Sequence, residues 1–95
     1  MITQDEKKQA LEAAAILSSE VFARSIKALA ARYVRGWRAS TNQEERERYW
    51  HLARALDDVQ AELFELLACA TAKARGKDPE INAAVKAARK NGGNG

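Results

Sequence analysis

Apolar residues recur every three or four positions along most of this chain, which is the spacing of an amphipathic α-helix. The first half of the chain carries an apolar stripe at Leu11, Ala15, Ser18, Phe22, Ile26, Leu29, Tyr33 and Trp37. The second half carries a strict coiled-coil seam at Tyr49, Leu52, Leu56, Val59, Leu63, Leu66 and Ala70. A shorter apolar face follows at Ile81, Ala84, Val85 and Ala88. The pattern predicts an all-α protein with three helices.

Helix-capping residues set the expected ends of these helices. Thr3 and Glu6 have the spacing of a capping box, and Gly36 is expected to end the first helix in a left-handed conformation. Asp78 before Pro79 opens the third helix, because Asp is a good N-cap and Pro is tolerated at the first helical position. The expected helices span residues 4–37, 42–75 and 79–90 of a single domain, 1–90, which a flexible tail follows at 91–95.

The stripes of the first two helices match when the chain folds back at residues 39–42. Ile26 then meets Leu56, and Phe22 meets Val59 or Gln60. We therefore expect a long antiparallel helical hairpin. The short third helix covers part of the open end of this hairpin.

Apolar residues outside the seam, such as Ile16, Val21 and Phe64, need a further cover. A first helix of residues 4–37 would also be about 50 Å long at 1.5 Å per residue, which is too elongated for a compact monomer. Both features favour a homo-oligomer, a dimer in which two hairpins form a four-helix bundle. The alternative is a monomeric three-helix bundle whose first helix breaks at Ser18–Ser19.

The composition agrees with a helical chain, and the absence of long apolar runs bears on its expected cellular location. Twenty of the 95 residues are Ala, whereas five are Gly and one is Pro. No run approaches the roughly 18 apolar residues that a membrane span requires. Acids also stand near the N-terminus, where a signal peptide carries only bases. We expect no membrane association and a cytoplasmic location, or the host cytoplasm if a phage or another mobile element encodes the chain.

Candidates for catalysis or metal binding are few. Glu47 and His51 stand four residues apart, which is the spacing of an ordinary helix pair as well as of two metal ligands. Cys69, the one cysteine, lies in an apolar run and is expected to be a small buried residue. No phosphate-binding loop or paired-cysteine motif is present. We expect the protein to have no enzymatic activity and no metal or other cofactor.

Charge is distributed unevenly, although the net charge is only +3. No acid occurs between Val21 and Gln43, whereas five bases project from the face of the first helix opposite its apolar stripe. We call these five residues the basic stripe: Arg24, Lys27, Arg32, Arg35 and Arg38. Four of them are Arg, whose planar guanidinium suits a carboxylate or a phosphate.

Three interpretations of the basic stripe compete. It is a solvated face that is partly neutralised by the second-helix acids Asp57, Asp58, Glu62 and Glu65. It is a contact surface for the phosphates of nucleic acid, to which the third helix adds Lys86, Arg89 and Lys90. It is a docking surface for an acidic protein partner.

The aromatic residues bear on the choice of partner. Tyr33, Trp37 and Tyr49 fall on the apolar stripes and are expected in the core. Trp50 points away from the seam beside Arg46, where a large aromatic residue commonly anchors a partner or stacks on a base. Burial of Trp50 at a subunit contact is the alternative.

The sequence favours a protein ligand over a nucleic acid. A net charge of +3 is low for a nucleic-acid binder of this size, and no base-reading motif is present. We therefore expect a protein-binding module, such as a regulator, inhibitor or adaptor, that acts by occlusion. Its expected contact residues are the basic stripe, Arg46 and Trp50. A helical-hairpin dimer that binds nucleic acid through the same residues is the alternative.

Overall fold

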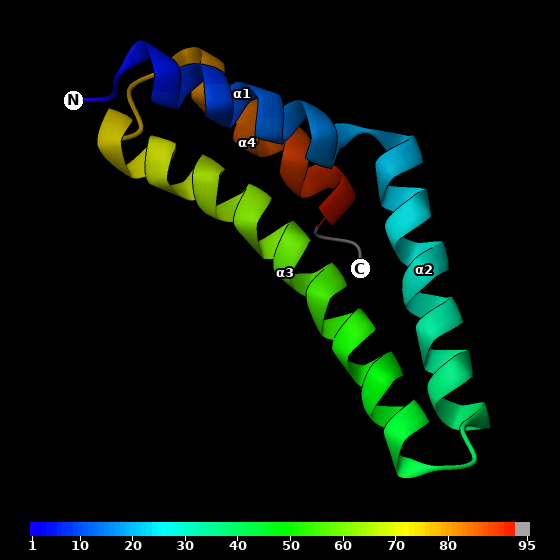
Figure 1. Ribbon diagram of the computed structural model, residues 1–95. Coiled ribbons are helices and arrows are strands. Elements are labelled where there is room, and N and C mark those ends of the chain that lie inside the picture. Colours follow the sequence, from blue (N-terminus) through cyan, green and yellow to red (C-terminus); the bar gives the residue numbers. More distant parts are fainter. Residues whose placement is uncertain (93–95) are drawn as a thin grey trace.

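The computed structural model describes residues 1–92, and the side chains of residues 1–90 (Figure 1). Its helices are α1 Gln4–Ser18, α2 Glu20–Ala39, α3 Gln43–Ala74 and α4 Pro79–Gly92. The all-α prediction is confirmed, because residues 1–92 contain helices and turns and no strand.

The prediction of one continuous first helix over 4–37 is wrong, because Ser19 separates α1 from α2. Ser19 has an extended backbone, with φ −69° and ψ 125°. Its hydroxyl accepts the backbone N–H of Phe22 at 3.2 Å and caps α2, while its own N–H donates to the carbonyl of Ile16 at 3.1 Å. Serine competes for backbone hydrogen bonds in this way and therefore favours helix ends. The break occurs where the three-helix alternative placed it.

The break directs α1 against both α3 and α4 (Figure 1). Its buried residues are Ala10, Ala13, Ala14 and Leu17. The stripe expected here lies one position beside the buried face: Ala15 is exposed, which contradicts the prediction, and Leu11 and Ser18 are half-buried. The stripe is derived for one continuous helix that packs on one partner helix. Helix α1 instead ends at Ser18 and packs on two helices, α3 and α4.

The buried core lies where α1, α3 and α4 meet. Four of its seven members are alanines. The full set is Ala10, Ala14, Leu17, Leu67, Ala70, Ile81 and Ala88. Alanine allows helix backbones to approach closely, and Ile81 is the largest side chain that is completely buried. We call α1, α4 and residues 61–74 of α3 the base. Helix α4 is thus part of the core and more than a cover for an open end.

The other part of the molecule is an arm, which consists of α2 and residues 43–60 of α3 (Figure 1). The two helices run antiparallel from the turn at residues 40–42, and α2 contributes no buried residue. The molecule measures 52 × 22 × 16 Å, and its radius of gyration is 16.2 Å, against about 13 Å for a compact domain of this length. The arm is a single layer of two helices.

The expected seam of α3 agrees with the burial at five of its seven positions, Tyr49, Leu56, Leu63, Leu66 and Ala70. Between these positions Leu52 and Val59 are 39% and 52% exposed, whereas Ala53 and Gln60 are half-buried. Residues three and four positions away both neighbour a buried residue on a helix. The side on which the neighbouring helix packs decides which of these two residues becomes buried. The sequence pattern alone does not determine that side.

Helix ends agree with the capping residues in part. The capping box is present, because Thr3 Oγ1 accepts the N–H of Glu6 at 3.1 Å and Glu6 Oε1 accepts the N–H of Thr3 at 3.1 Å. The carboxylate of Asp78 caps α4 by accepting the N–H of Ile81 at 3.2 Å. Gly36, in contrast, does not end a helix, since α2 continues through it to Ala39.

The C-terminal boundaries are close to those expected. Arg75 and Gly76 have φ values of 56° and 70°, and this left-handed pair ends α3. Helix α4 continues to Gly92, two residues beyond the expected end. The rest of the expected flexible tail, residues 93–95, lies outside the described residues.

Candidate functional site

The basic stripe lies along the outer face of α2. All five of its side chains are exposed, whereas the half-buried residues of α2 include Phe22, Ile26, Leu29 and Tyr33. Because a helix turns about 100° per residue, this spacing places the stripe on the side away from α3. The stripe extends for about 21 Å, which is fourteen residues at 1.5 Å each.

The acids of α3 do not neutralise the stripe within the chain. The four acids considered for that role are exposed: Asp57, Asp58, Glu62 and Glu65. The ion pairs of Lys7 with Asp78 and Glu80 and of Lys73 with Glu6 lie in the base, and none of them involves the stripe. The basic stripe is therefore an uncompensated positive surface of this chain.

Trp50 lies on α3, about two helical turns from the turn at residues 40–42, and is 54% exposed. The guanidinium carbon of Arg54 lies 5.7 Å from the centroid of the Trp50 ring, in a cation–π arrangement. The ring of His51 packs against it edge to face, with centroids 5.1 Å apart and an interplanar angle of 75°. Arg46 is also exposed, one helical turn before Trp50.

A small apolar hollow opens beside Trp50, between α2 and α3. Its volume is about 170 Å³, and we call it the aromatic hollow after its lining residues Tyr33, Val34, Trp37, Tyr49, Trp50 and Ala53. Tyr33 and Tyr49 are half-buried, as expected of seam residues. Trp37, however, was expected in the core and is 47% exposed. It lies at the edge of a two-helix layer, where a third element would be needed to cover it.

Sequence reasoning missed Val34, Trp37 and Ala53 as members of this site. Val34 is off the apolar stripe, and Ala53 stands beside the expected seam residue Leu52. Only the side on which α2 packs against α3 brings them together. The one signal in the sequence was that both tryptophans of the chain lie within about two helical turns of the same predicted turn.

The arm has a second, aliphatic flank. Leu52 and Val59 are exposed there, and Leu52 is two residues from Trp50, so the two side chains point about 160° apart on α3. We call Leu52 and Val59 the aliphatic flank. The two sides of the arm thus differ in chemistry, aromatic with arginines on one side and aliphatic on the other.

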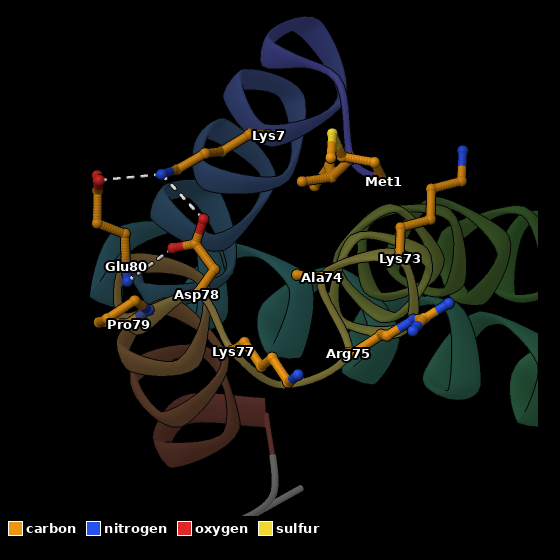
Figure 2. A pocket seen from close by; sticks show the side chains of 10 residues that line it. Met1, Lys7, Lys73, Ala74, Arg75, Lys77, Asp78, Pro79 and Glu80 are labelled. Atoms are coloured by element: carbon orange, nitrogen blue, oxygen red, sulfur yellow. Dashed lines mark hydrogen bonds and ion pairs between the residues drawn. The ribbon is translucent and has the colours of Figure 1, made fainter.

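A wider cleft of about 660 Å³ opens at the opposite end of the molecule, between the start of α1 and the turn before α4 (Figure 2). Figure 2 shows Lys7 reaching between Asp78 and Glu80, with Nζ 3.0 Å from an oxygen of each. The hydrogen bond from Lys7 lowers the pKa of Asp78, and the hydrogen bond to Asp78 raises the pKa of Lys7. These paired charges connect α1 to α4, and we assign them a structural role.

The remaining chemical candidates of the sequence are Cys69 and the pair Glu47 and His51. Cys69 is exposed, which contradicts the expectation of a buried residue. It stands on the outer side of α3, away from the helices that pack on Leu67 and Ala70. Across the part of the chain that the structure describes, no three His, Cys, Asp or Glu side chains gather as metal ligands would.

No helix among the described residues combines the length and apolarity that crossing a bilayer demands. No family model, curated protein or solved structure matches this chain. Fold and site together therefore define a class by architecture alone, a small all-α protein with a three-helix base and an exposed two-helix arm.

Proposed function

We propose that this chain is a small protein-binding module that regulates, inhibits or adapts its partner by covering part of the partner's surface. The observation that supports this function is the exposure of α2. A surface helix ordinarily buries its apolar face in its own core, but none of the 20 residues of α2 is buried. Its apolar residues Val21, Val34 and Trp37 are exposed and therefore available to another chain, and exposed apolar surface commonly marks an interaction site.

The acidic partner contacts the basic stripe, Arg46 and Trp50 in this proposal. Charges that no intramolecular acid pairs attract an oppositely charged surface and increase the rate of encounter. A half-exposed tryptophan with an arginine over its ring is a typical anchor at protein interfaces. Together these groups offer both attraction at a distance and apolar contact at short range.

The chain also forms a homodimer in this proposal, through the aliphatic flank. One chain exposes 7099 Å², whereas a compact monomer of 10.5 kDa exposes about 5,400 Å². The surplus of about 1,700 Å² exceeds the roughly 800 Å² that each partner buries in a standard interface. Two arms that meet through Leu52 and Val59 would form a four-helix bundle and leave both basic stripes outside.

The dimer is tested by the double substitution Leu52→Glu with Val59→Glu. We expect the wild-type chain to sediment as a dimer at tens of micromolar and the variant to sediment as a monomer with unchanged helicity. Ala61→Glu is the control, because Ala61 is also exposed on α3 but lies on the other side of it. A wild-type chain that remains a monomer at these concentrations would overturn the dimer.

The protein-binding function is tested by reversing Arg24, Arg35 and Arg38 to Glu. These side chains point away from α3, so helicity and oligomeric state should not change. Capture from the native host should lose its protein partner with this variant and keep it after nuclease treatment. If the reversal instead dissociates the oligomer, the stripe is an ion-pair face between subunits.

Nucleic acid is the second candidate ligand, because the stripe is acid-free over about 21 Å. Binding to phosphates would make the logarithm of affinity fall linearly with the logarithm of salt concentration, by about 0.7–0.9 per phosphate contacted. A protein partner should give a shallower dependence and a requirement for Trp50. Partners that disappear only after nuclease treatment would favour nucleic acid.

A further inference from the structure

The aromatic hollow has no occupant within the part of the chain that the structure describes. Val34, Trp37 and Trp50 line it and are 45%, 47% and 54% exposed. We propose that it is the anchor pocket for an acidic polypeptide segment of the partner, and that it takes one Phe- or Leu-sized side chain. This inference rests on the proposed protein-binding function and adds the position of the site and the chemistry of the ligand.

The size and lining of the hollow fit a single apolar side chain. Its volume is about 170 Å³, and a cavity of about 150 Å³ with an apolar lining holds one benzene molecule. Trp and Tyr are the residues most enriched among those that dominate binding energy at interfaces, particularly where they form a pocket that excludes water. Four of the six lining residues are Trp or Tyr.

The charge around the hollow selects an acidic segment. Between Arg32 and Arg54 the chain has six arginines and three glutamates, a net charge of +3, which equals the net charge of the whole chain. Glu44 and Glu45 belong to the first turn of α3, where the helix dipole stabilises acids, and Glu47 accepts a hydrogen bond from Gln43 at 3.3 Å.

Three of the arginines stand beside the hollow. Arg38 is four residues after Val34, and Arg46 and Arg54 are four residues before and after Trp50, so each neighbours a lining residue on the same helix face. Two acids have the same relation to a lining residue, Glu45 to Tyr49 and Asp57 to Ala53. Carboxylates on both sides of an apolar anchor would therefore meet guanidinium groups.

Two other occupants fit less well. A second copy of this chain would bring the arginines of one hollow against those of the other, and like charges at an interface oppose association. A nucleic-acid base would have to stack on Trp50, but Arg54 lies over that ring and His51 packs against it. An acidic polypeptide needs neither group to move.

The chain offers a direct spectroscopic test. Its two tryptophans, Trp37 and Trp50, both line the hollow, so intrinsic tryptophan emission reports on this site alone. A library of random dodecapeptides without Trp is selected against the full chain, and enriched peptides are titrated while emission and the anisotropy of a peptide label are recorded. We expect acidic peptides with one Phe or Leu, which shift the emission to shorter wavelength.

Matched variants locate the binding. Val34→Glu places a carboxylate at the mouth of the hollow and should weaken peptide affinity about tenfold or more, as loss of an interface anchor does. Val21→Glu makes the same change at another exposed valine of α2, outside the hollow, and should change affinity less than about twofold. Arg54→Gln should weaken binding and its salt dependence, whereas Arg48→Gln, also exposed on α3, should do neither.

The possible failures are distinguishable. Peptides that bind without changing tryptophan emission, and that bind Val34→Glu normally, would overturn the anchor pocket and leave the proposed protein-binding function intact. A selection that enriches no peptide, or only peptides without acids, would overturn the proposed ligand. If a 20-residue oligothymidylate shifts the emission and no peptide does, the protein-binding function fails as well, in favour of nucleic acid.

Discussion

The ring of Tyr49 packs directly on the backbone of Gly36. A Cβ atom on residue 36 would lie 2.8 Å from Tyr49 Cδ1 and would overlap Cε1 and Cζ. The glycine therefore permits close approach of α2 and α3 near the turn, and it does so from within a helix that continues to Ala39. A hydrogen bond from Ser40 Oγ to the carbonyl of Gly36, at 2.7 Å, holds the end of α2 in place.

The substitution Gly36→Ala should therefore destabilise the protein. In an ordinary helix interior this change adds about 1 kcal/mol of stability, because Ala is the better helix former. Here the added methyl group overpacks the contact, and we expect the free energy of unfolding to fall by about 1–2 kcal/mol, measured by urea unfolding with circular dichroism. In a Tyr49→Ala background the sign should reverse. A stabilising effect in both backgrounds would contradict the contact.

Enlarging the alanines of the base should also damage folding. Ala14 and Ala70 are 3% and 2% exposed within a core of small residues, so Ala14→Leu or Ala70→Leu should each cost about 1–3 kcal/mol. Ala15→Leu is the control on the same helix, because Ala15 is exposed and the change should be nearly neutral. Thermal unfolding of the three variants measures the difference. Equal melting temperatures for Ala14→Leu and Ala15→Leu would contradict the observed face of α1.

Removing the cap at the break should weaken α2. Ser19→Ala deletes the hydroxyl that accepts the N–H of Phe22, and the loss of a serine N-cap costs about 1 kcal/mol. Ser25→Ala, at an exposed position in α2, should leave stability unchanged or raise it slightly. Chemical unfolding of both variants compares the two serines. A loss for Ser25→Ala that matches the loss for Ser19→Ala would show that the cap is not responsible.

Stability should depend on pH through Lys7 and Asp78. The pKa of Asp78 lies below its ordinary value of about 3.9, so its contribution is present above about pH 4 and is lost as pH falls through the lowered pKa. The pKa of Lys7 lies above its ordinary value of about 10.4, so its contribution is complete below that pH and is lost as pH rises through the raised pKa.

The substitution Asp78→Asn isolates this charge effect, because Asn also caps helices. The wild-type chain should be more stable than Asp78→Asn from about pH 5 to 9, and the difference should shrink as pH falls towards about 2. Urea unfolding across this range provides the measurement. A difference that does not change with pH would mean that the cap, and not the ion pair with Lys7, stabilises α4.

Local interactions made much of this fold predictable. The 3.6-residue repeat and the caps at Thr3 and Asp78 depend on residues only a few positions apart, and the sequence displays them directly. The outward position of the basic stripe follows from the same repeat, because residues opposite an apolar face are exposed wherever that face packs. The exposure of Trp50 was predictable for the same reason.

Tertiary contacts decided the rest. Ser19 could continue a helix or cap one, and the break exists because α1 gains a core with α3 and α4 when it turns away. The choice between Leu52 and Ala53 as seam residue depends on the side from which α2 packs, which neither residue encodes alone. That same choice brings Val34 and Trp37 of α2 beside Trp50 and Ala53 of α3. Sequence periodicity therefore determined that the basic stripe and Trp50 face outward, and only the packing of helices against one another determined which apolar residues stay exposed and which of them form a common site.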